Sequence, residues 1–186
     1  MKSVLISIQP YWVFLIIAKK MGWDIEEEKT VEVRKNYPKD ENWNKVAQIY
    51  CSKNSKSFNK IPEKFRPFMK PFLGKVIGEF VCDEITKAEV GSYYKLPMNK
   101  TQIDALDLME YANDESLYGW HIANLKIYDK PQNLSDFMKV CKFDSPCIIC
   151  GFHFPDTPLM EAHCKNSERY FTRPPQNWCY TEPMLK

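Results

Sequence analysis

The sequence predicts an α+β domain built on a small β-barrel with flanking helices. A strand, a helix and a second strand open the chain, and several further segments in which apolar and polar residues alternate follow them. Helical stretches do not alternate regularly with these strands. A doubly wound parallel sheet and a helical bundle are therefore both disfavoured.

The first strand spans residues 4–8, and an apolar helix follows over residues 10–21. Pro10 suits a first helical turn, because its missing N–H is not needed there, and Gly22 suits the end of a helix. The helix is apolar on nearly all sides, so we expect it to be buried.

The remaining elements follow from alternation, helical spacing and turn residues. Gly78 lies inside a long apolar strand and indicates a bulge or a close approach to a ligand. Residues 129–131 predict a turn. The predicted helix has Asp104 early in its length and carries its apolar residues on one side. The predicted ranges are strands at 30–34, 46–51, 75–85 and 120–128 and a helix at 101–112, with Ile103, Leu106 and Met109 on its apolar side.

The length of 186 residues suffices for one domain with a proper core and a small appendage. We assign residues 1–135 to the domain and residues 136–186 to a Cys-rich extension that packs on it. Near the end of the chain, Trp178 and Tyr180 alternate with Cys179 and predict an edge strand on the domain. A peptide that docks a partner is the alternative.

Composition places the chain among ordinary soluble proteins, with 44% hydrophobic and 27% charged residues. The net charge of +2 gives no global indication of nucleic-acid binding. The apolar run at residues 11–18 is too short to span a bilayer, and no small-residue cleavage site follows it. We therefore expect a cytoplasmic protein without a membrane partner.

A basic segment extends from Lys53 to Lys75, with six lysines and one arginine against one glutamate. Basic residues interleaved with aromatic ones are typical of single-strand nucleic-acid binding. The alternative is a solvated loop and short helix whose aromatic residues fill the core. The aromatic residues are Phe58, Phe65, Phe68 and Phe72.

Seven cysteines, an odd count, favour thiols or a metal over disulfides. Cys147 to Gly151 has the form of a zinc knuckle, in which two thiolates bind one structural zinc and the glycine permits the tight turn. A redox pair and plain buried thiols are the alternatives. Near-stoichiometric zinc in the purified protein would support the site. The candidate ligands are Cys141, Cys147, Cys150 and Cys164, with His163 or His153 as alternatives to Cys141 for the fourth position.

Residues 29–34 carry the densest set of polar groups on one predicted strand. Side chains two apart share a face, so Thr30, Glu32 and Arg34 point the same way, and Lys29 opens the strand. A rigid element of this kind is suited to hold a site. A solvated outer face with a surface ion pair is the alternative.

This segment resembles the ASCH family of PUA-like domains, in particular its small phage and prophage members. The family pattern is Gly-x-Lys-x-x-Glu-x-Arg, which Lys29, Glu32 and Arg34 match, whereas Glu27 stands at the glycine position. The resemblance extends over residues 3–128 and implies a PUA-like barrel. It also implies binding of RNA or modified bases, or hydrolysis of the N4-acetylcytidine or ribonuclease type.

We expect Lys29, Glu32 and Arg34 to lie at the mouth of a cleft between the barrel and the helix and to converge there on a concave pocket sized for a nucleobase. Arginine grips a phosphate or a base edge with two hydrogen bonds, and a carboxylate accepts from an exocyclic amine. Trp12, Tyr11 or Trp120 can stack on a base. The candidate ligand-binding residues are Gln9, Trp12, Lys29, Thr30, Glu32, Arg34, Glu79 and Trp120.

Catalysis would depend on Lys29 and Glu32. In the related amidohydrolases a nucleophilic threonine stands at the position of Glu32, so Thr30 would have to take that role here. His121 is either a proton shuttle or a structural residue beside Trp120.

Three functions follow from these residues. The first is a module that binds RNA, other single-stranded nucleic acid or a nucleotide. The second is a hydrolase, either a ribonuclease or a deacylase of a modified base. The third is a phage protein that binds a host protein. Binding is favoured because no nucleophile–base pair is assured.

Overall fold

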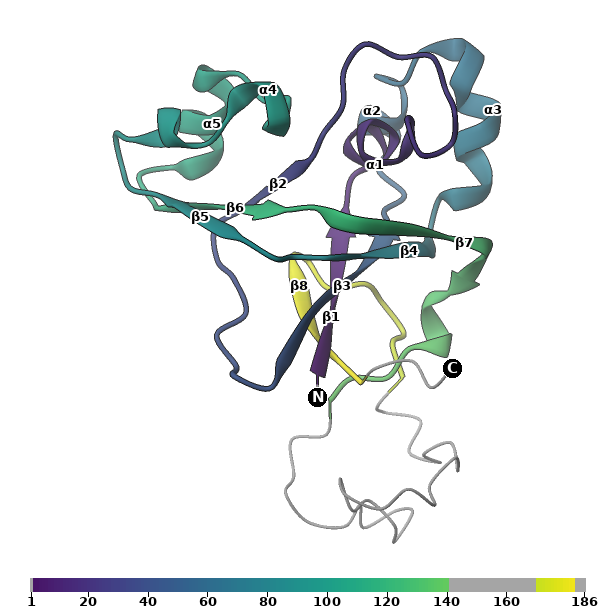
Figure 1. Cartoon of the computed structure of the whole chain (residues 1–186). Coiled ribbons are helices and arrows are strands. Elements are labelled where there is room, and N and C mark those ends of the chain that lie inside the picture. Colours follow the sequence, from purple (N-terminus) through teal and green to yellow (C-terminus); the bar gives the residue numbers. More distant parts are fainter. Residues whose placement is uncertain (1, 141–169, 183–186) are drawn as a thin grey trace, which may run out of the picture.

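The computed structural model describes residues 2–140 and 170–182, which form an α+β fold with two sheets (Figure 1). A five-stranded sheet has the order β7-β4-β3-β1-β8, and a three-stranded sheet has the order β2-β6-β5. No hydrogen-bonded ladder joins the described strands into the closed barrel that the sequence predicts. The strands are β1 (Lys2–Ile8), β2 (Val31–Arg34), β3 (Trp43–Cys51), β4 (Lys75–Val81), β5 (Ile85–Ala88), β6 (Leu117–His121), β7 (Ala123–Asn133) and β8 (Trp178–Thr181).

Short helices cover both sheets. They are α1 (Pro10–Ile17), α2 (Ser55–Phe58), η1 (Glu63–Phe65), α3 (Arg66–Met69), η2 (Lys70–Phe72), η3 (Tyr93–Lys95), α4 (Met98–Thr101), α5 (Ala105–Ala112) and η4 (Leu134–Asp136). In Figure 1, α4 and α5 lie together above the three-stranded sheet, whereas α1, α2 and α3 lie above the five-stranded sheet. Within residues 2–140 and 170–182, no helix has the length and apolar character needed to cross a membrane.

The main core lies between α1 and the five-stranded sheet. β1 pairs in parallel with β3, which is possible because the chain between them crosses over through α1. Ile6 and Ile49 point from the sheet toward Val13 and Ile17 of the helix, and all four are buried. This packing confirms the prediction that the first helix is buried, and it stabilises the sheet by removing apolar surface from water.

The helical path after β1 ends at Gly22, as the sequence predicts, although the regular helix stops at Ile17. Trp23 N–H donates to Ala18 O (2.9 Å), and Gly22 N–H donates to Lys19 O (3.0 Å). This pair of bonds is a Schellman closure, and it requires the positive φ of +71° that Gly22 adopts.

Two predicted strands are each divided in the structure, because the chain passes from one sheet to the other. The predicted strand at 75–85 becomes β4 and β5, and the predicted strand at 120–128 becomes β6 and β7. At the crossing, His121 N–H bonds to Glu84 O and Ile122 N–H bonds to Thr30 O. A sequence pattern of alternation continues through such a crossing and therefore does not reveal it.

The turn predicted at residues 129–131 is wrong, because these residues belong to β7. β7 is an edge strand, where Pro131 is tolerated although it lacks an N–H. The bulge predicted at Gly78 is confirmed by the shift in β-pairing register on both of its neighbours. A Cβ at Gly78 would collide with the carbonyl oxygen of Lys126, so the close approach is to backbone.

Within the helix predicted at 101–112, residues 105–112 form α5 with Asp104 as its cap, and Thr101 is the last residue of α4. The predicted apolar side is wrong. Leu106 is 78% exposed and Met109 57% exposed, whereas Leu108 and Ala112 are buried. These two pack in a small separate core, which also holds Val33, Tyr93, Leu96 and Leu117. α5 starts four residues later than predicted, and its contacts with this small core decide which of its apolar residues are buried.

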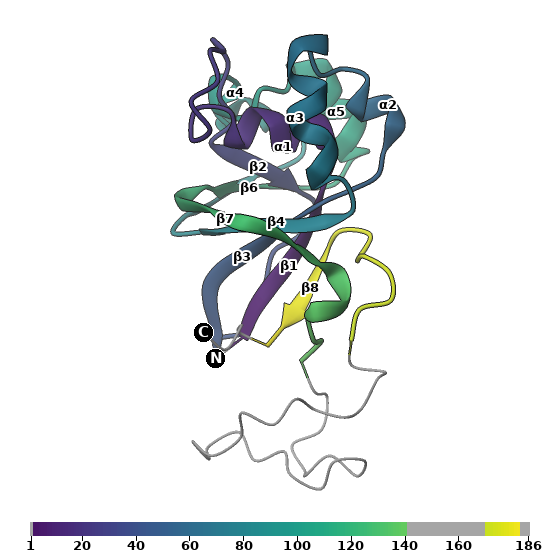
Figure 2. The same ribbon diagram turned by 90° about the vertical axis from the view of Figure 1, so that its right-hand side faces the viewer.

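The end of the chain adds β8 antiparallel to β1, which confirms the predicted edge strand. Figure 2 shows β8 beside β1 on the outer side of the sheet. The Thr181 hydroxyl donates to Gln48 Oε1 (3.0 Å) on β3. Phe171 and Phe137 cover the face of the sheet opposite α1, against Leu5.

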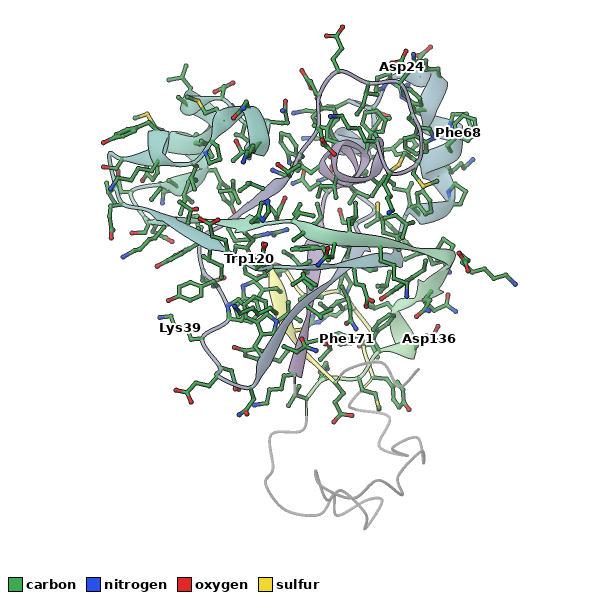
Figure 3. The ribbon with its side chains drawn as sticks, viewed as in Figure 1. Asp24, Lys39, Phe68, Trp120, Asp136 and Phe171 are labelled. Carbon is green, nitrogen blue, oxygen red and sulfur yellow. The ribbon has the colours of Figure 1, made fainter. Side chains whose placement is uncertain are left out.

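The aromatic residues of the basic segment mostly serve the core. Phe65 and Phe72 are buried. The ring of Phe65 stacks on that of Trp23, with 5.5 Å between the ring centroids. Phe68 differs, since it is 60% exposed and projects from the outer edge of the molecule (Figure 3).

Candidate functional site

Three charged side chains meet beneath the surface at the start of β2. Lys29, Glu32 and Arg34 are 1%, 5% and 8% exposed. Arg34 Nη2 lies 2.9 Å from Glu32 Oε1, and Lys29 Nζ lies 3.5 Å from Glu32 Oε2. The polar face that the sequence predicts for this strand is therefore present, but it is buried and not a solvated outer face. We call these three residues the charge cluster.

Groups from distant parts of the chain hold the charge cluster. Lys29 Nζ donates to the carbonyl oxygen of Thr101 at the end of α4 (2.7 Å). Arg34 Nη2 donates to Ser7 O (2.7 Å), and Arg34 Nη1 donates to the side-chain oxygen of Asn177 (3.0 Å). The Asn177 amide in turn donates to Asn36 Oδ1 (2.8 Å).

Two polar atoms of the charge cluster lack hydrogen-bond partners among the described residues. These atoms are Glu32 Oε2, an acceptor, and Arg34 Nε, a donor, and both are shielded from solvent. Buried polar atoms are nearly always hydrogen-bonded in folded proteins. An acceptor and a donor that make no hydrogen bond within one cluster are groups that the edge of a nucleobase can complement.

Burial lowers the pKa of Lys29 from its ordinary value. The Glu32 carboxylate opposes this shift, while the Arg34 guanidinium adds to it. A lysine with a lowered pKa can act as a base. Within residues 2–140 and 170–182, however, no hydroxyl or thiol is hydrogen-bonded to Lys29, so the lysine has no nucleophile to activate there.

Two aromatic residues flank the charge cluster. Lys29 Nζ lies 5.0 Å from the centre of the Trp12 ring, within cation–π range. Tyr111 on α5 is 41% exposed, and Arg34 and Glu32 lie close enough to influence its phenol. Burial raises the pKa of Tyr111, Arg34 lowers it and Glu32 raises it. An exposed aromatic thus stands beside the buried charges.

The other candidate residues are placed differently. Gln9 is exposed at the start of α1, and Thr30 is partly buried, with its N–H bonded to Lys100 O. Trp120 lies opposite Glu32 in the β2–β6 register, but it is fully buried between Trp43 and Trp178. Figure 3 shows Trp120 in the interior, where no base can stack on it.

Glu79 does not join the charge cluster. It lies opposite Gln48 in the β3–β4 register and accepts a hydrogen bond from the Tyr128 hydroxyl (3.0 Å). His121 forms a 2.6 Å contact with Asp83 in a partly exposed position, so it does not lie in the core. Neither residue has a contact with Lys29, Glu32 or Arg34.

The three charged side chains converge as the sequence predicts, but they are buried. Two cavities, of about 420 Å³ and 290 Å³, lie elsewhere, and no residue of the charge cluster lines either of them. The Thr101 carbonyl and the Asn177 side chain cover the groups that a base would contact. The covering groups are polar, a backbone carbonyl and a side-chain carboxamide, and each makes one hydrogen bond to the cluster.

The predicted zinc ligands Cys141, Cys147, Cys150 and Cys164, with His153 and His163, lie outside the described residues. Among the residues that the structure describes, no group of three or more potential ligands is placed to hold a metal ion. Burial raises the pKa of the Cys51 and Cys82 thiols to about 12, so neither is ionised at neutral pH.

Asn177, Tyr111 and Thr101 are functional candidates that sequence reasoning missed. Asn177 lies in a Pro-rich stretch that predicts only an extended chain, and no local pattern connects it with Arg34. A pairing of residues so far apart in the chain becomes visible only when β8 is placed beside β1.

The solved structures to which this chain is similar include three crystal structures of an ASCH protein from Zymomonas mobilis. A tyrosine-to-phenylalanine variant shares 16% identity over 72% of this chain and 77% of that chain, with a TM-score of 0.48. A serine-to-alanine variant shares 18% over 72% and 75%, with a TM-score of 0.49. The unsubstituted protein shares 17% over 72% and 74%, with a TM-score of 0.45.

Comparison with protein-family models gives no match, and comparison with curated proteins gives none either. The TM-scores of the three solved structures lie below 0.5. The likeness of this chain to the ASCH family therefore depends on its own residues, chiefly Lys29, Glu32 and Arg34.

Proposed function

We propose that this chain is a nucleic-acid-binding module of ASCH type that takes a base of single-stranded RNA, or a modified nucleobase, at the charge cluster. The observation that carries the proposal is that two buried atoms make no hydrogen bond among the described residues: Arg34 Nε, and Glu32 Oε2, which has only the 3.5 Å ion pair with Lys29. An unmade hydrogen bond costs about 1–3 kcal/mol per buried group, and more for a charged one. A ligand that donates a hydrogen bond to Glu32 Oε2 and accepts one from Arg34 Nε removes that cost.

The energetics of the charge cluster favour a role other than stability. Taking three charges out of water is expensive, and apolar side chains of similar volume are often as stable as a buried ion pair. Lys29, Glu32 and Arg34 are nevertheless all buried. Buried charges with a shifted pKa, such as Lys29, concentrate at functional sites.

Asn177 occupies the place of the ligand in this proposal. Its carboxamide offers a carbonyl to Arg34 Nη1 and an amino group to Asn36 Oδ1. A cytosine edge also presents a carbonyl and an amino group. When the Asn177 side chain moves away, the Nη1 group of Arg34 is free to donate a hydrogen bond to the base. Tyr111 then provides an exposed ring beside the charge cluster on which the base stacks.

Binding is favoured over hydrolysis because Lys29 donates to a backbone carbonyl and pairs with a carboxylate. An amidohydrolase of the related type needs a hydroxyl beside the lysine, and Glu32 stands at that position. Glu32 is suited instead to accept a hydrogen bond from an exocyclic amine.

Fluorescence anisotropy with a short single-stranded RNA, measured at about 50 mM and 200 mM salt, tests the proposal. We expect binding that weakens with salt. The Asn177→Ala variant should bind more tightly, by about 3- to 10-fold, because removal of one competing hydrogen bond is worth roughly 0.5–1.5 kcal/mol. Gln176→Ala, an exposed neighbour, is the matched control and should bind as the unsubstituted chain does.

The opposite results are equally clear. Absence of RNA binding at the lower salt concentration rules the proposal out. Equal affinities of the Asn177→Ala and Gln176→Ala variants would show that the charge cluster is not the base site. Release of acetate from N4-acetylcytidine, lost on Lys29→Met, would move the assignment from binding to hydrolysis.

A further inference from the structure

We infer that the chain holds a second site, for a phosphate group, in the cavity of about 420 Å³ at the end of the five-stranded sheet. The identity of the ligand rests on the proposed function, in which the phosphate belongs to single-stranded nucleic acid. The cavity lies where β3 ends and β4 begins, and residues 172–174 close it from the far end of the chain.

The charge of the cavity lining favours an anion. Lys53 and Arg173 line it, and no carboxylate does. Neither cation has an ion-pair partner within residues 2–140 and 170–182, although 24 acidic residues are present in the chain. Arginine and lysine are the side chains that bind phosphate, the first with a planar fork and the second as a point charge.

The Lys53 side chain lies against Gly74. The glycine has a φ of +74°, and a Cβ at this residue would collide with Lys53 Cε. The aliphatic part of the lysine therefore lies directly across the glycine backbone. Gly74 N–H also donates to Cys51 O (2.8 Å), which ties the turn to the end of β3. The glycine thus leaves room for the lysine side chain to lie along the turn that borders the cavity.

Ser52 provides an unfilled polar group. Its Oγ is buried and has no hydrogen-bond partner in the described part of the chain, whereas its N–H bonds to Ile8 O. A serine hydroxyl can donate to a phosphate oxygen. Because a buried hydroxyl without a partner is unfavourable, Ser52 favours an occupied cavity over an empty one.

The remaining lining suits the apolar part of a nucleotide. Tyr50, Leu134 and Pro174 face the same cavity as the two cations. A volume of about 420 Å³ falls in the range of small-molecule sites and exceeds the need of a phosphate alone. A sugar or base therefore packs beside the phosphate, as is usual in single-strand binding.

The two sites can serve one short oligonucleotide. Arg173 lies four residues before Asn177, which contacts Arg34 of the charge cluster. Four residues span at most about 14 Å. The short segment from Thr172 to Asn177 therefore connects the phosphate site with the base site, so that one nucleic-acid strand can contact both.

The experiment compares RNA affinity and its salt dependence for two double variants of equal charge. Lys53→Gln with Arg173→Gln removes the two cations of the cavity. Lys126→Gln with Lys130→Gln removes two exposed lysines of β7 and is the matched control. The probe is a short single-stranded RNA, with and without a 5′-phosphate, and inorganic phosphate is tested separately by its effect on the melting temperature.

We expect the cavity variant to bind RNA about 10- to 100-fold more weakly and the control to change less than 2-fold, since two charge-assisted contacts are lost only in the first. The slope of log affinity against log salt should fall by roughly 0.7 for the phosphate that is no longer neutralised. Ser52→Ala should also weaken binding without unfolding the chain, because its hydroxyl makes no hydrogen bond that stability depends on.

Equal weakening in the two double variants overturns the inference, because general electrostatics then explains the binding. Preference for the 5′-phosphorylated RNA assigns the cavity to a terminal phosphate, and equal affinity assigns it to a backbone phosphate. If no RNA binds, but inorganic phosphate raises the melting temperature of the unsubstituted chain and not of the cavity variant, the proposed function fails and the phosphate site stands.

Discussion

Replacing Glu32 by Gln should destabilise the fold strongly, because the substitution leaves Lys29 and Arg34 buried without a counter-charge. Glu32 lies 2.9 Å from Arg34 and 3.5 Å from Lys29. At an effective dielectric constant of about 20, these distances correspond to attractions of roughly 6 and 5 kcal/mol. Release of the carboxylate from its own desolvation returns several kcal/mol, so a net loss of about 3–5 kcal/mol is expected.

Urea denaturation and thermal unfolding of the Glu32→Gln variant measure this loss. For a chain of this size, 3–5 kcal/mol corresponds to a melting temperature lower by about 6–20 °C. Glu28→Gln is the control, because Glu28 forms a more exposed ion pair with Lys19 (2.8 Å). Such surface pairs contribute less than about 1 kcal/mol.

This reasoning would be refuted if the free energy of unfolding of the Glu32→Gln variant lay within about 1 kcal/mol of that of the unsubstituted chain. So small a loss is expected for surface pairs and would mean that solvent screens the attraction between Glu32 and its two partners. A triple variant in which Lys29, Glu32 and Arg34 become apolar residues of similar volume separates stability from function. We expect it to be at least as stable as the unsubstituted chain while RNA binding is lost.

Three further predictions concern other parts of the structure. Between the lowered pKa of Lys29 and its ordinary value of 10.5, the unfolded chain binds a proton that the folded chain has released, so the free energy of unfolding should rise with pH in this window; urea titrations should show the rise in the unsubstituted chain and not in Lys29→Met. In thermal unfolding, Gly78→Ala should lower the free energy of unfolding by about 1–3 kcal/mol, because the added Cβ collides with backbone. Gly91→Ala meets no neighbouring atom and should lower it by about 1–2 kcal/mol, because alanine is strained at a φ of +75°. Cys51 and Cys82, whose pKa values burial raises to about 12, should stay unmodified by iodoacetamide at pH 8 until the chain unfolds, and rapid labelling of either in the folded chain by site-resolved mass spectrometry would contradict their burial.

Local patterns predict the first half of the fold well. Strand β1, the buried helix α1 and strand β2 follow from apolar spacing, from Pro10 and from Gly22. The edge strand β8 follows from alternation alone. These elements are determined by interactions between residues that are near in sequence, or by a single buried face, and such features leave a visible period in the chain.

Longer elements are predicted less well. The sequence does not reveal that residues 82–84 and Ile122 mark crossings between two sheets, because the apolar pattern continues across both. The apolar face of α5 is also missed, since contacts with Tyr93 and Leu96, and not the helix sequence itself, decide that Leu108 is buried and Leu106 exposed.

For the candidate site, the sequence by itself identified the lysine, the carboxylate and the guanidinium and predicted their shared face, because residues two apart on a strand point the same way. The tertiary structure alone decided that they are buried, that the Thr101 carbonyl and Asn177 cover them, and that Trp120 is enclosed. Burial depends on contacts between residues far apart in the chain, such as Arg34 with Asn177. No short window of sequence contains both partners of such a contact.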